Sequence, residues 1–92
     1  MSMTKKVSTV WARVPGEDDA ELIAERETFL QAALDAGKTD SVEPTIEQDA
    51  EGTHHAYRNW TNESTANEWI AFVNTLSTKY GIAVTTTVDN IE

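Results

Sequence analysis

Two adjacent histidines, His54 and His55, are the residues in this chain best suited to proton transfer or metal binding. They fall within a predicted strand, so their side chains point to opposite faces and cannot bind one ion from one chain. A general base also needs a positioned partner and a pocket, and the sequence shows neither. The chain has no cysteine, no glycine-rich phosphate loop, no HExxH motif and no calcium loop. We therefore expect no metal site and no cofactor, and we assign no catalytic residue.

Two tryptophans and two arginines form the strongest candidate for a binding site. Trp11 and Arg13 alternate on one predicted strand, and Arg58 and Trp60 alternate on another. Arginine side chains stack on aromatic rings and bind carboxylates with two parallel hydrogen bonds, so these four residues suit a small anionic or planar ligand. The alternative that we favour is packing of the same residues in a homodimer interface, because exposed tryptophans on a small monomer would leave a large apolar patch.

Acidic residues are concentrated in one part of the chain. The net charge is −9, and twelve of the sixteen acidic residues lie between residues 17 and 51. The simplest interpretation is a solvated helix face with acidic turns; a saline habitat would also favour such a surface. A sharper hypothesis is an acidic surface, centred on Asp18, Asp19 and Glu21, that docks on a basic protein partner or mimics nucleic acid. Binding to nucleic acid itself is disfavoured because the sequence has no basic stripe.

The periodicity of apolar residues predicts six elements in one domain that spans residues 1–92. The expected strands are 5–14, 42–49, 53–61 and 82–88, and the expected helices are 18–36 and 63–80. Asp18 and Glu21 resemble a capping box for the first helix. Asn62 is a suitable N-cap for the second helix, and Gly81 is suited to end it in a left-handed conformation.

This order of elements predicts an α+β fold of the ferredoxin-like βαββαβ type. It is a four-stranded antiparallel sheet with both helices on one face, the first and third strands in the centre and the strand that contains Pro44 at an edge. We expect the uncovered face of the sheet to carry the functional or interface residues, and we place there Thr9, Trp11, Arg13, Arg58, Trp60 and Thr85–Thr87.

The segment from Tyr57 to Ala66, YRNWTNESTA, resembles the strand-to-helix signature of the dimeric α+β barrel superfamily, in particular the antibiotic-biosynthesis-monooxygenase-like domains. The resemblance implies a ferredoxin-like subunit that dimerises. Haem-degrading members of this superfamily use an Asn on the first strand, a Trp at the end of the third and a His on the second helix. Only Trp60 matches here: the first strand has Ser8 or Thr9, and the second helix has Trp69 and Ile70. These departures argue against haem binding and cofactor-free oxygenation.

Three hypotheses follow from the sequence. We favour a non-catalytic homodimer that serves as an interaction or regulatory module in the cytoplasm, without a membrane span. The second is a monooxygenase-like enzyme or small-ligand binder of the dimeric-barrel type. The third is an acidic inhibitor or nucleic-acid mimic.

Overall fold

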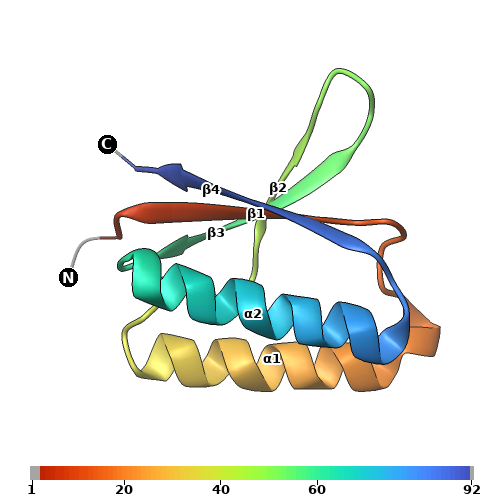
Figure 1. Ribbon diagram of the computed structural model, residues 1–92, viewed down its shortest axis with the longest axis horizontal. Helices are drawn as coiled ribbons and strands as arrows, with labels where there is room; N and C mark the ends of the chain where they lie inside the picture. The colour runs from red at the N-terminus through yellow and green to blue at the C-terminus, as the bar shows by residue number, and fades with distance from the viewer. Residues whose placement is uncertain (1–2, 92) are drawn as a thin grey trace.

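The computed structural model of the protein describes residues 3–91, which form a four-stranded antiparallel sheet with two helices on one face (Figure 1). The elements are β1 (Lys5–Trp11), the 3-10 helix η1 (Glu17–Asp19), α1 (Ala20–Asp35), β2 (Thr45–Gln48), β3 (His54–Trp60), α2 (Glu63–Tyr80) and β4 (Val84–Asn90). The strands lie in the order β2-β3-β1-β4. The predicted ferredoxin-like fold is confirmed, with β1 and β3 in the centre and β2 at an edge.

The strands differ from prediction mainly at their ends. β1 stops at Trp11, which pairs with the first residue of β4, Val84, so the chain beyond it has no partner strand apart from one bond between Ala12 and Ala83. β2 begins only after Pro44, whose missing N–H cannot join a ladder. β2 pairs with β3 through the predicted hairpin, and Gly52 adopts the left-handed conformation in its turn.

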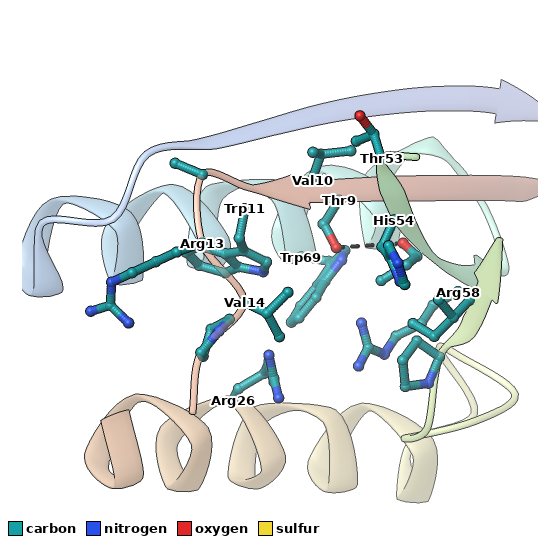
Figure 2. A pocket seen from close by; sticks show the side chains of 15 residues that line it. Thr9, Val10, Trp11, Arg13, Val14, Arg26, Thr53, His54, Arg58 and Trp69 are labelled. Carbon is teal, nitrogen blue, oxygen red and sulfur yellow. Dashed lines mark hydrogen bonds between the residues drawn. The ribbon is translucent and has the colours of Figure 1, made fainter. Parts of the chain in front are cut away.

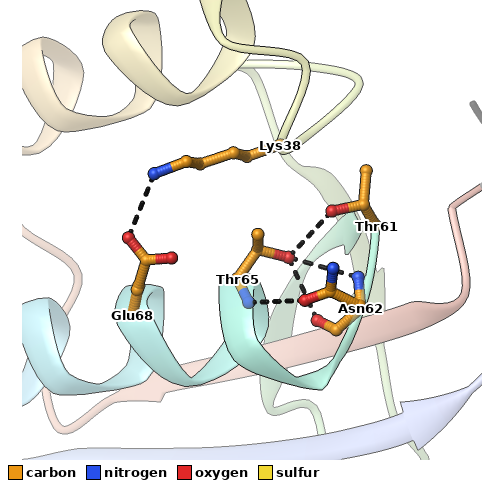
Figure 3. A network of polar contacts seen from close by, with 5 residues as sticks. All are labelled: Lys38, Thr61, Asn62, Thr65 and Glu68. Atoms are coloured by element: carbon orange, nitrogen blue, oxygen red, sulfur yellow. Dashed lines mark hydrogen bonds and ion pairs between the residues drawn. The ribbon is translucent and has the colours of Figure 1, made fainter.

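The ends of α2 are fixed as the sequence predicts. The Asn62 side-chain oxygen accepts a hydrogen bond from the Thr65 amide at 2.9 Å, and the Thr65 hydroxyl lies 3.1 Å from that of Thr61 (Figure 3). At the other end, Gly81 has a φ of 69°, a conformation that few residues with a Cβ adopt. Lys38 and Glu68 form an ion pair at 3.1 Å, which joins the segment after α1 to α2.

The predicted capping box at the start of the first helix is wrong in its residues. The first turn is η1, and the Asp19 carboxylate, not the side chain of Asp18 or Glu21, accepts a hydrogen bond from the Gly16 amide at 2.9 Å. The capping pair is therefore Gly16 and Asp19, two residues earlier than the predicted pair Asp18 and Glu21.

The core lies between the sheet and the two helices. Trp60 of β3 and Trp69 of α2 stack with their ring centroids 5.7 Å apart, and both are fully enclosed. Val7, Leu30 and Val73 surround this pair. A second cluster, Leu22, Leu76 and Ile82, closes the other end of the helix pair.

Candidate ligand-binding site

The helix-facing side of the sheet also borders a cavity of about 460 Å³. The end of β1 and the loop that follows it form one wall, the start of β3 and β2 form another, and α1 lies opposite. Figure 2 shows the guanidinium groups of Arg26 and Arg58 pointing into one space, with the ring of Trp69 behind them. The lining residues that matter for the chemistry are Thr9, Trp11, Arg26, His54, Arg58 and Trp69.

The register of the sheet determines which side chains reach the cavity. β1 and β3 pair with Val7 opposite Arg58 and Thr9 opposite Ala56, so these residues share one face. Val7 is fully buried in the core against the helices, which makes this the helix-facing side. His54, two residues before Ala56, lies on the same face as Arg58.

The prediction that the two tryptophans and Arg58 lie on the uncovered face is therefore wrong. Trp60 has no exposed surface, Arg58 is 6% exposed, and Trp11 packs partly buried against the core. Thr9 faces the helices as well. Thr85 and Thr87 do lie on the open face as predicted, together with Lys6, Ser8, His55 and Tyr57, whereas Thr86 lies on the helix-facing side.

Of the four predicted site residues, the structure brings Trp11 and Arg58 together at the cavity. Trp60 belongs to the core. Arg13 lies at the rim and turns away from the space between the other arginines (Figure 2). It forms a two-pronged ion pair with Asp19, with nitrogen–oxygen distances of 2.6 and 3.0 Å.

Arg58 is a buried cation, and no carboxylate of the described residues forms an ion pair with it. Its Nε donates to the Val42 carbonyl oxygen at 2.9 Å, and its guanidinium carbon lies 5.2 Å from the centroid of the Trp69 ring. Burial, and then repulsion by Arg26, lower the pKa of Arg58 to about 10, although Glu43 acts in the opposite direction. The group is still charged at neutral pH.

Arg26 is the second cation of the cavity. Burial lowers its pKa, with nearby Glu27 and Glu43 partly offsetting the effect. Within residues 3–91, neither Arg26 nor Arg58 forms an ion pair. Two guanidinium groups thus line one partly open pocket, and in the described part of the chain no carboxylate is paired with either of them.

Arg26 and Trp69 are site residues that the sequence pattern alone does not indicate. Trp69 was assigned to the core, where it does lie, but one side of its ring also borders the cavity. In the sequence, Arg26 is one of two basic residues in an acidic segment. A signal was present: Arg26 lies four residues after Leu22 and four before Leu30, so it interrupts the buried stripe of α1 with a cation.

The two histidines occupy different environments, as expected for neighbours on a strand. His54 lines the cavity. On the open face, His55 Nε2 lies 2.9 Å from an Asp49 carboxylate oxygen, and His55 Nδ1 lies 3.3 Å from the Ser8 hydroxyl. Ser8 is only 4% exposed, so a substrate has little access to this hydroxyl. We interpret the chain of contacts as a link that holds the β2–β3 hairpin to β1.

The three residues of the predicted acidic surface do not act alike. Asp18 and Glu21 are exposed, whereas Asp19 is 9% exposed and committed to Arg13 and the Gly16 amide. These contacts lower the pKa of Asp19 to about 2, and the hydrogen bond from Arg13 has the largest effect. A basic partner would therefore meet two exposed carboxylates here, those of Asp18 and Glu21. Docking of such a partner remains a prediction.

In the part of the chain that the structure describes, no helix is both long and apolar enough to span a membrane. The same residues hold no cluster of three potential metal ligands. No protein-family model matches the sequence, and a search of curated proteins finds no similar sequence.

Proposed function

We propose that this small α+β domain binds a compact ligand with a planar apolar body and a carboxylate, in the cavity between the sheet and α1. The observation that carries the proposal is the pair Arg26 and Arg58, two cations in one cavity that have no ion-pair partner among residues 3–91.

An anion would relieve the unfavourable electrostatics of this pair. Burial of an uncompensated charge costs several kcal/mol in general, and a second like charge nearby adds to that cost. A carboxylate between the two guanidinium groups would gain charge-assisted hydrogen bonds, which are worth about 1.5–3 kcal/mol each. The Nε of Arg58 already binds Val42, which leaves its terminal nitrogens for a ligand.

The rest of the cavity suits an apolar, planar group. Trp11 presents aromatic surface, Trp69 closes the inner wall although it is only 1% exposed, and Val14, Pro44 and Ile46 add aliphatic surface. A volume of about 460 Å³ lies within the range that is usual for small-molecule sites. Thr9 and His54 are polar groups that can orient a ligand at one side.

Kinship with the dimeric α+β barrel superfamily is part of the proposal at the level of the fold. The element order and the turn from β3 into α2 support it. The haem-degrading members use a Trp at the end of the third strand and a His on the second helix. Here Trp60 is enclosed in the core, and α2 has Trp69 where the His would lie. Both features favour ligand binding over oxygenation. We also keep the expectation of a homodimer, with a surface that does not use the tryptophans.

Nuclear magnetic resonance of the three tryptophan indole N–H groups tests this proposal directly. Benzoate and 1-naphthoate serve as probes, and benzyl alcohol and 1-naphthalenemethanol serve as their neutral counterparts. We expect at least one carboxylate to shift the Trp11 and Trp69 signals more than that of Trp60, because only the first two line the cavity. The neutral counterpart should bind at least about tenfold more weakly.

Three variants decide whether the arginines hold the carboxylate. Arg26→Gln and Arg58→Gln should each weaken binding by about tenfold or more. Lys79→Gln removes an equal charge from the exposed end of α2 and should leave binding unchanged. If Arg58→Gln does not fold, Arg26→Gln decides alone. Equal affinity for carboxylate and alcohol, equal affinity in Arg26→Gln and Lys79→Gln, or no shift with either carboxylate at millimolar concentration would overturn the proposal.

A further inference from the structure

The two edges of the sheet differ in how well they are protected. β2 has four residues, follows Pro44 and carries Glu47, all of which discourage pairing with another strand. β4 has seven residues, VTTTVDN, with neither proline nor lysine and with Asp89 as its one charge. Among residues 3–91, β4 pairs only with β1. β4 therefore offers a long, β-branched edge.

Two hydrogen bonds show which backbone groups of β4 point outward. The Ala12 amide donates to the Ala83 carbonyl oxygen at 2.8 Å, and the Ile91 amide donates to the Thr4 carbonyl oxygen at 2.9 Å. In an antiparallel pair, backbone groups point toward the partner strand at every second residue. The odd-numbered residues of β4 therefore face β1. The N–H and C=O groups of the even-numbered residues face outward, and these are Val84, Thr86, Val88 and Asn90.

We propose that two copies of the chain associate through β4, antiparallel, about a two-fold axis at Thr87. This register places Val84 opposite Asn90 and Thr86 opposite Val88, so every outward pair can exchange two backbone hydrogen bonds. A register shifted by one residue is excluded, because it would place the outward backbone groups of one copy opposite residues of the other copy whose groups face β1. Shifts by two residues shorten the contact. The proposed register uses all seven residues of the strand.

The side chains of β4 are compatible with their own copies in this register. Thr87 meets Thr87 on the open face, and each Asp89 lies opposite Thr85 instead of the other Asp89. On the helix-facing side, Val88, which is 39% exposed, would contact Thr86 of the other copy. The pairing joins two sheets into one of eight strands.

The distribution of charge also favours a second copy at this edge. The acidic segment, residues 17–51, forms α1, β2 and their connections, and β2 is the strand farthest from β4 in the sheet. Association through β4 keeps the two acidic segments apart, although each chain carries a net charge of −9. No residue of β4 lines the cavity, so this inference does not depend on the proposed ligand.

The first experiment is sedimentation of the wild type and of Thr86→Pro over a range of concentrations. Proline at position 86 removes an outward N–H and leaves the ladder with β1 complete. We expect a concentration-dependent dimer for the wild type and a dissociation constant at least about tenfold higher for Thr86→Pro. Thr86→Val, which keeps the N–H and the branched Cβ, should behave as the wild type.

Amide hydrogen exchange identifies the surface independently of any variant. In the dimer, the outward amides of Thr86 and Val88 should be protected, and this protection should be lost on dilution. The inward amides of Thr85 and Thr87 should stay protected at every concentration. If Thr86→Pro does not fold, this pattern in the wild type decides. A protein that is monomeric at all concentrations, or a dimer in which the Thr86 and Val88 amides exchange freely, would overturn the inference.

Discussion

The guanidinium group of Arg58 on β3 lies over the ring of Trp69 on α2, with 5.2 Å between its central carbon and the ring centroid. The contact joins the sheet to the helix layer at the inner wall of the cavity. Trp69 also stacks on Trp60, so Arg58 contacts the aromatic core directly. A change at Arg58 will therefore affect both ligand binding and packing, whereas Arg26 offers a cleaner test.

Arg26→Leu is expected to stabilise the protein while it removes the carboxylate site. Leucine continues the buried stripe of Leu22 and Leu30, and no ion pair within residues 3–91 is lost. The free energy of unfolding in urea should rise by up to about 1 kcal/mol, and binding of the carboxylate probes should be lost. Arg26→Gln is the control, since it removes the charge without adding apolar surface. A clear loss of stability in Arg26→Leu would contradict this prediction.

Asp19 is expected to make the protein sensitive to acid. Its pKa is lowered from the usual 3.8 to about 2 in the folded state, so the unfolded chain takes up the proton first as pH falls. The stability that the Arg13–Asp19 pair contributes is thus present above about pH 4 and is lost between about pH 4 and pH 2.

The measurement is urea denaturation of Asp19→Asn and of the wild type from neutral pH to pH 2. Asp19→Asn should be less stable at neutral pH, and the two proteins should converge in acid. Asp18→Asn, a change of the adjacent exposed acid, should follow the wild type at each pH. Parallel curves for Asp19→Asn and the wild type would show that the pair contributes nothing.

Asn62→Ala should destabilise the protein by about 1 kcal/mol, because the Thr65 amide loses its side-chain acceptor at the start of α2. Urea denaturation measures the effect. Asn67→Ala is the matched control within the same helix: Asn67 is exposed, and alanine is the better helix former. Equal stability of the two variants would refute the role of the cap.

Gly81→Ala should cost about 1 kcal/mol, since its φ of 69° lies in the left-handed region where a Cβ is unfavourable. Gly16 provides the control. Its φ is −126°, and a Cβ there would meet no atom within 4 Å. We expect the midpoint of thermal unfolding to fall for Gly81→Ala and to stay within error for Gly16→Ala; similar shifts in both would contradict this account.

The sequence predicted the order of the elements and the caps of α2 because these depend on local patterns. Asn62 and Gly81 mark the ends of α2 through their own backbone and side-chain preferences. The face of β3 that meets the helices could not be predicted in the same way. Both faces carry large side chains, with Tyr57 and His55 on one and Arg58 and Trp60 on the other, and a period of two separates the faces without saying which is covered.

The cavity could not be predicted from the sequence for a related reason. Arg26 and Arg58 are 32 positions apart in the chain, on different layers, and their proximity follows from the packing of α1 on the sheet. The sequence of segment 53–61 indicates Arg58 as a ligand for an anion. The second cation, Arg26, lies on α1, whose sequence is typical of an acidic, solvent-exposed helix. Only the tertiary structure places the two charges in one space.

The opposition between an acidic chain and a cationic cavity has a kinetic consequence. An approaching anion is repelled by a protein with a net charge of −9 until it comes within contact of Arg26 and Arg58. At an ionic strength of about 0.1 M, repulsion beyond roughly 10 Å is largely screened, whereas interactions of buried or partly buried charges are screened much less. Added salt should therefore accelerate the entry of a carboxylate ligand, the reverse of ordinary electrostatic steering.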